Sequence, residues 1–167
     1  LFYLDDAAMR AVLDELLALL RDPHLEVREM AATTLAGVVR CSQRAHIRRL
    51  RAEFADMAAT WLPKRGTPGF DAALLRAHAG VLGATALVAA FPYEVPDWMP
   101  SLVLDTIAVH SDSPAPIAAT VRRCAADFRR TYVRSRDALT QPPGHMGRGP
   151  APLRRARAGA ARLYAGP

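Results

Sequence analysis

The chain has 167 residues, of which 51% are hydrophobic, and a net charge of +6. This length and composition suit one domain with a buried core and exclude a chain that is disordered throughout. No secretory-signal pattern opens the sequence, and no apolar run approaches the ~18 residues of a membrane-spanning helix. We therefore expect neither secretion nor contact with a membrane.

The excess positive charge is confined to the C-terminal part. Through Tyr132 the chain holds fifteen basic and fifteen acidic residues, so residues 133–167 carry the whole net charge. Helical periodicity ends at the same point, and Pro, Gly, Ala and Arg dominate beyond it. We expect a folded domain over 1–132 and a mostly disordered basic tail after it. Apart from Tyr164 near its end, the tail has no aromatic residues among its arginines, so no sequence-specific nucleic-acid binding is expected.

A proline separates the first two expected helices. Apolar residues recur every three or four positions over 5–21 and again over 25–39, which predicts two helices that each bury one face. Pro23 ends the first helix, because proline disfavours helical geometry in the residue before it.

Two further helices flank a loop rich in Pro and Gly. We expect one helix over 42–62, with Trp61 facing inward, and another over 71–87. Gly80 and Gly83 weaken the second helix intrinsically, so they indicate close packing against a neighbour.

The segment 91–100 contains three prolines and three aromatic residues. Two interpretations stay open at this point. Phe91 and Trp98 fill the gap between consecutive repeats, or the aromatic rings face a ligand. Helices are expected after this segment over 99–109 and 116–132.

Three of the expected helices share a register. Each contains an aliphatic-Arg pair and, four residues after the aliphatic residue, an alanine: Val27-Arg28 with Ala31, Leu75-Arg76 with Ala79, and Val121-Arg122 with Ala125. The spacing is close to the ~40 to 47 residues of HEAT-type helix pairs. The alanine allows close helix approach, the aliphatic residue enters the core, and the arginine lies at the edge. The sequence therefore predicts an all-α, HEAT-like α-solenoid of about three antiparallel helix pairs, an architecture that binds rather than catalyses.

Patterns of catalytic or metal-binding residues are missing. Cys41 and Cys124 sit at core-facing helical positions and are interpreted as buried free thiols. The histidines have no Cys or His partner at zinc spacing, so we predict no metal and no cofactor. There is no nucleophile elbow, zinc-protease motif or phosphate-binding loop, so no enzymatic activity is expected.

Four blocks of the sequence resemble a known family. They are Leu25–Leu35, Arg76–Gly83, Tyr93–Pro100 and Pro116–Thr131. In this order they resemble the C-terminal region of the large single-chain proteasome activators of the subunit 4 type, which are built from HEAT-like repeats. The resemblance implies a non-catalytic partner of the alpha ring of the proteasome core particle. It also implies gate opening and ubiquitin-independent degradation, in nucleus and cytoplasm.

The resemblance suggests a proteasome anchor near the C-terminus. Family members end in a hydrophobic residue, a tyrosine and a final residue whose carboxylate pairs with a lysine between alpha subunits. Leu163, Tyr164 and Ala165 have this pattern, but Gly166 and Pro167 follow. An internal copy lacks the carboxylate, so the charged contact is missing. The alternative interpretation is a chance match.

The resemblance also implies a bromodomain-like pocket for acetylated histones. In the family an Asn-Phe pair precedes the Arg-Arg-Thr of the last helix, where this chain has Asp127 and Phe128. An ionised aspartate cannot donate to an acetyl oxygen as an asparagine amide does, so we expect weakened recognition. Tyr93 and Trp98 complete the candidate pocket. Alternatively, Asp127 is a surface residue next to a structural Phe128.

Basic residues of the third helix and of the following loop form a candidate positive rim: Arg44, Arg48, Arg49, Lys64 and Arg65. They either face anionic ligands and acidic substrates or line a solvated helix face. The alternative to a proteasome activator is a generic HEAT-repeat scaffold or transport adaptor that binds extended peptides.

Overall fold

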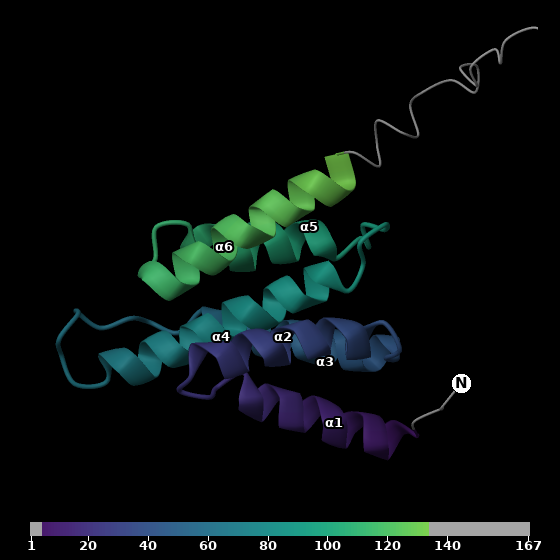
Figure 1. Ribbon diagram of the computed structural model, residues 1–167, viewed down its shortest axis with the longest axis horizontal. Coiled ribbons are helices and arrows are strands. Elements are labelled where there is room, and N and C mark those ends of the chain that lie inside the picture. The colour runs from purple at the N-terminus through teal and green to yellow at the C-terminus, as the bar shows by residue number, and fades with distance from the viewer. Residues whose placement is uncertain (1–4, 134–167) are drawn as a thin grey trace, which may run out of the picture.

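The computed structural model describes residues 5–133, and every regular element within them is helical. The helices stack in layers, with α1 at one end, α6 at the other, and α4 between them (Figure 1). This arrangement confirms the prediction of an all-α, solenoid-like fold.

The helix bounds lie close to the predicted ones. The first four helices are α1 (Asp6–Leu19), α2 (Leu25–Val39), α3 (Arg44–Ala58) and α4 (Phe70–Ala89). The C-terminal part comprises α5 (Met99–Ser101), the π-helical η1 (Leu102–Ile107), the 3₁₀-helical η2 (Ala108–His110), α6 (Ala115–Phe128) and the π-helical η3 (Arg129–Val133). The helix expected over 99–109 is therefore present, but most of it has wider or tighter turns than an α-helix.

Local chemistry accounts for the helix starts. Asp5 caps α1, because its carboxylate accepts a hydrogen bond from the Ala8 N–H at 2.7 Å. Gly69, before α4, has a φ of 86°, a left-handed conformation that favours glycine. Pro116 lies in the first turn of α6, where its missing N–H would have no partner inside the helix.

The prediction for Trp61 is wrong. Helix α3 ends at Ala58, four residues earlier than expected, and Trp61 is 78% exposed in the loop that follows. Its neighbour Leu62 packs against the core instead. The helical repeat of 3.6 residues predicts which side chains face inward only up to the last residue of the helix, so it does not apply to Trp61.

Cys41 and Arg28 also differ from expectation. Cys41 is exposed because α2 ends at Val39, which places the thiol in the following turn, whereas Cys124 is half-buried. Arg28 was expected at the edge, but only 7% of it is exposed. Its guanidinium finds hydrogen-bond acceptors inside the fold, as described below.

The shared alanine register holds for two of the three helices. Ala31 is 3% exposed and Ala79 fully buried, which confirms close helix approach there. Ala125 is exposed, because it lies on a side of α6 that no described helix covers.

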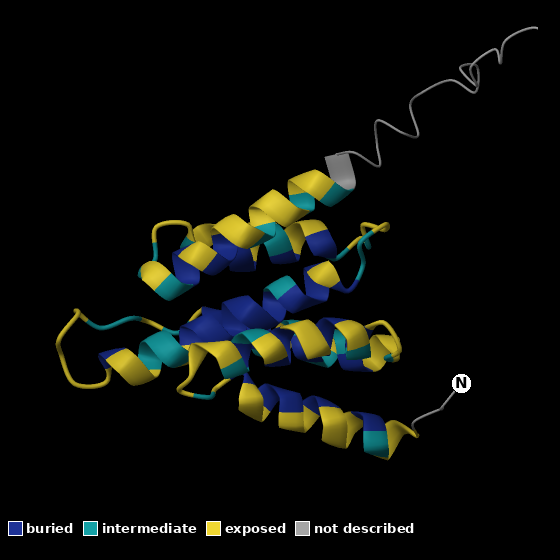
Figure 2. Ribbon diagram, viewed as in Figure 1, coloured by how far each residue is buried: buried dark blue, intermediate teal, exposed yellow. Residues whose placement is uncertain are grey.

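Helix α4 forms the centre of the core (Figure 2). It has 20 residues and a mean hydropathy of 1.5, which is long and apolar enough to cross a bilayer. The expectation that no run approaches this length is therefore wrong. Within the fold 61% of the apolar window is buried, and a helix surrounded by other helices needs the same composition.

The two glycines of α4 bring it close to α3. A Cβ on Gly80 would lie 2.8 Å from the Met57 Cβ, and one on Gly83 would lie 2.5 Å from the Phe54 Cζ. Met57 and Phe54 are fully buried and have little room to move. The prediction of close packing at both glycines is confirmed.

We expect Gly83→Ala to lower the free energy of unfolding by ~1–3 kcal/mol, because the new methyl group overlaps the Phe54 ring. Urea unfolding measures the change. Gly37→Ala is the matched control, since a Cβ there meets nothing within 4 Å. This control gains ~0.5–1 kcal/mol from helix propensity. A stabilised Gly83→Ala chain would contradict the close approach of α3 and α4.

Candidate functional site

A groove of about 830 Å³ lies between α2 and α6, with the C-terminal half of α4 beneath it. Small and apolar side chains form its base, and charged side chains from α2, α6, η3 and the residue after α2 surround it. The base includes Ala32, Ala36, Leu82, Ala86 and Ala89, and the charged residues are Glu26, Glu29, Arg40, Arg123, Asp127 and Arg130. Such a surface suits an elongated ligand with apolar and polar groups.

A buried polar network fixes the positions of the three helices around the groove. The Arg28 Nε–H of α2 donates to His78 Nδ1 of α4 at 3.2 Å. Because arginine can only donate, the ring proton of His78 is on Nε2, which donates to Thr120 Oγ1 of α6 at 3.0 Å. The Thr120 hydroxyl in turn donates to the Pro116 carbonyl at 3.0 Å. One chain of hydrogen bonds therefore joins α2, α4 and α6.

A second nitrogen of Arg28 donates to the turn before α2. Its Nη1 donates to the carbonyl oxygens of Asp22 at 2.7 Å and of Pro23 at 2.9 Å. Desolvation lowers the pKa of Arg28 from its ordinary value, but the guanidinium keeps its charge. A buried cation is tolerated here because backbone carbonyls accept its hydrogen bonds and the carboxylates of Asp22, Glu26 and Glu29 lie near enough to favour its charge.

The same burial keeps His78 neutral. Desolvation, with a contribution from the Arg28 charge, lowers the pKa of His78 to about 4. A protonated ring would place a second cation against Arg28 and lose its acceptor nitrogen. At neutral pH the network therefore has one defined pattern of donors and acceptors.

Exposed ion pairs line the groove, and the first of them joins its two sides. Arg123 of α6 pairs with Glu29 of α2 at 2.9 Å, and Arg130 pairs with Asp127 at 2.9 Å. The arginines are 60% and 72% exposed, so each pair contributes only ~0–1 kcal/mol. A charged ligand can exchange partners with them at little cost.

Two of the four candidates for an acetyl-lysine pocket line the groove. Asp127 and Phe128 line the groove, whereas Tyr93 and Trp98 are not among its lining residues. Tyr93 is 87% exposed. Trp98 stacks edge-on with Phe91, with ring centroids 5.6 Å apart, and both pack against the core. That contact agrees with the gap-filling interpretation of this loop.

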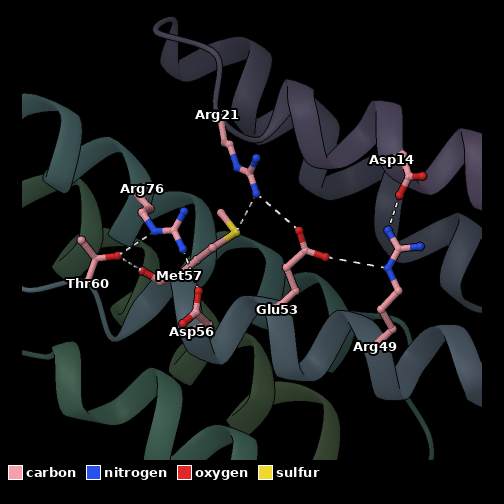
Figure 3. A network of polar contacts seen from close by, with 8 residues as sticks. All are labelled: Asp14, Arg21, Arg49, Glu53, Asp56, Met57, Thr60 and Arg76. Atoms are coloured by element: carbon pink, nitrogen blue, oxygen red, sulfur yellow. Dashed lines mark hydrogen bonds and ion pairs between the residues drawn. The ribbon is translucent and has the colours of Figure 1, made fainter.

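Arg49 is the one candidate rim residue that forms ion pairs within the described part. It pairs with Asp14 of α1 and, at 3.9 Å, with Glu53 of α3 (Figure 3). Arg44, Arg48, Lys64 and Arg65 are exposed. The candidate anchor residues Leu163, Tyr164 and Ala165 lie outside the described residues.

Neither Arg28 nor His78 was predicted as part of a site. The sequence did contain a signal for His78, because this histidine interrupts the most apolar helix of the described residues.

Cys124 lies in the groove, but burial, with Asp127 nearby, raises the pKa of its thiol to about 11. It therefore stays protonated and is a weak nucleophile. Within residues 5–133 no three metal-ligating side chains gather.

Comparison with known proteins identifies the family of the chain. Residues 74–135, which include α6 and most of α4, match the family model "Proteasome activator complex subunit 4-like, C-terminal". Proteasome activator complex subunit 4A of Danio rerio is 41% identical over 78% of the chain, and subunit 4 of Xenopus laevis is 38% identical over 79%. The chain belongs to the proteasome activator subunit 4 family.

The likeness extends to plants. Proteasome activator subunit 4 of Arabidopsis thaliana is 34% identical over 68% of the chain. The chain spans only 8% of the length of the two vertebrate relatives and 6% of the plant relative. The region that the family model matches includes His78, Thr120 and Asp127, so the groove lies largely within the family's C-terminal region.

We expect the stability of the fold to fall as the pH drops from 6.5 towards 4. In this window the unfolded chain protonates His78 at its ordinary pKa of 6.5, whereas the folded chain does not until about pH 4. The loss attributable to this residue is up to about 3 kcal/mol. Urea unfolding at a series of pH values measures it.

The comparison chain for this experiment carries His78→Gln. Glutamine keeps one acceptor for Arg28 and one donor for Thr120 but does not titrate. The pH dependence between 6.5 and 4 should shrink in that variant. An unchanged slope would show that other groups dominate acid unfolding.

Proposed function

We propose that this chain is part of a non-catalytic proteasome activator that binds the alpha ring of the proteasome core particle. Binding would promote gate opening and ubiquitin-independent degradation in nucleus and cytoplasm. The observation that carries the proposal is 38–41% identity, over more than three quarters of the chain, to proteins named Proteasome activator complex subunit 4.

The chemistry of the described residues supports binding rather than catalysis. The buried histidine is held neutral in a network, and the groove cysteine is held protonated. Neither is available as an acid, base or nucleophile at neutral pH. An activator of this kind would act by binding one state of the gate more tightly than the other.

We expect a chain ending at Ala165 to bind purified core particle more tightly than a chain ending at Pro167. The shorter chain presents the carboxylate after Leu163 and Tyr164 that the anchor requires. Native-gel binding and turnover of a fluorogenic peptide measure both effects. Tyr164→Ala in the shorter chain is the control and should abolish the gain.

If neither chain binds, the anchor assignment fails and the segment is better described as a peptide-binding scaffold. If both bind equally, core-particle binding stands, and the contact lies elsewhere in the chain.

A second candidate function is recognition of histone tails in the groove. Asp127 and Phe128 line it together, and the base beneath them is apolar. Asp127 accepts a hydrogen bond from Arg130 and, as a carboxylate, offers no donor to an acetyl oxygen. We therefore propose a weakened preference for acetylated lysine in this chain.

Asp127→Asn should raise the preference for acetylated over unmodified histone peptides by up to about tenfold, because the amide restores a donor. Calorimetric titration with both peptides measures the ratio. Asp112→Asn, at an exposed aspartate outside the groove, is the control. A strong acetyl preference in the unaltered chain would contradict the proposed weakening.

A further inference from the structure

Trp61 lies in the loop between α3 and α4 and is the more exposed of the two tryptophans. The side chain is 78% exposed, whereas the other tryptophan, Trp98, packs against the core. The loop is exposed along most of its length (Figure 2). Tryptophan is among the residues most enriched where partner proteins bind, because it buries a large apolar surface.

The fold holds Trp61 outward through its two neighbours. Before it, Arg76 of α4 donates to the Thr60 hydroxyl at 3.1 Å and pairs with Asp56 at 2.7 Å (Figure 3). After it, Leu62 packs against the core. With both neighbours fixed, the exposure of the indole is a property of the folded loop.

The rest of the loop is also ordered by local bonds. The Thr67 N–H donates to the Lys64 carbonyl at 3.1 Å, and the Phe70 N–H donates to the Thr67 carbonyl at 3.2 Å. Gly66 and Gly69 both have a φ of 86°, which permits these tight turns. A pre-ordered loop loses little conformational entropy when a partner binds.

The charge beside the indole is positive. Lys64 and Arg65 follow Trp61 by three and four residues and are exposed. Within residues 5–133 no carboxylate forms an ion pair with either of them, whereas the nearby Asp56 is already paired with Arg76. The loop therefore offers an apolar contact flanked by two cations, which is complementary to an acidic ligand with apolar side chains.

We propose that the loop between α3 and α4 is a docking element for an acidic peptide segment of a partner protein. Trp61 makes the apolar contact, and Lys64 and Arg65 make the electrostatic one. This site is separate from the groove, and it does not depend on the proposed binding to the core particle.

Two sets of short synthetic peptides test the proposal. Both have the same Leu and Phe positions, and the intervening residues are Glu and Asp in one set and Lys and Arg in the other. Fluorescence anisotropy of labelled peptides measures binding to the whole chain, and iodide quenching reports whether the exposed indole becomes covered. We expect only the acidic set to bind, with an affinity that falls as the salt concentration rises.

Matched variants separate the loop from general surface effects. Trp61→Ala should weaken acidic-peptide binding by at least about tenfold, and Lys64→Glu with Arg65→Glu should reverse the preference towards the basic set. Tyr93→Ala and Arg122→Glu alter an exposed aromatic and an exposed cation elsewhere, so binding should not change. Urea unfolding verifies that every variant is folded.

The proposal is overturned if the acidic set binds no better than the basic set. It is equally overturned if Trp61→Ala binds as the control variants do. Binding to the core particle is a separate assay, so either proposal can fail while the other stands.

Discussion

The arrangement of the fold depends on the absence of side chains at Gly80 and Gly83. These residues allow α4 to lie directly against Phe54 and Met57 of α3. At 3.6 residues per turn, positions 78 and 82 lie on the opposite face of α4 from position 80. The close contact with α3 therefore turns His78 and Leu82 towards α2 and α6, where one joins the polar network and the other lines the groove.

Polar contacts in this protein divide into two classes by burial. The buried chain from Arg28 through His78 to Thr120 is shielded from water, so removing His78 leaves the Arg28 Nε–H without its acceptor and costs Thr120 one hydrogen bond. The exposed pairs, such as Arg123 with Glu29, are solvated and exchangeable. The first class therefore sets the spacing of α2, α4 and α6, and the second is available to a ligand without disturbing that spacing.

Periodicity predicted the helices, and glycines in an apolar helix predicted the close contact, because both follow from packing along one element. Periodicity could not locate the end of α3, so Trp61 was placed inward. It could not predict that Arg28 would find acceptors in the turn at Asp22 and Pro23 and become buried. It also could not tell which side chains of a loop line a groove. Of the four residues that the resemblance grouped, Asp127 and Phe128 line the groove, whereas Tyr93 and Trp98 are not among its lining residues.

Helix α4 connects the two surfaces proposed to bind partners. Its first turn closes the loop that holds Trp61, since the Phe70 N–H donates to Thr67, and its last two turns lie under the groove. From Phe70 to Thr85 the helix rises ~22 Å, at ~1.5 Å per residue. Because α4 is packed on most sides, this separation is fixed. A partner that reaches both surfaces gains effective concentration only if the segment joining its two binding motifs spans the distance between Trp61 and the groove. A ligand too short to span that distance binds only one surface, so the loop and the groove can bind ligands independently of each other.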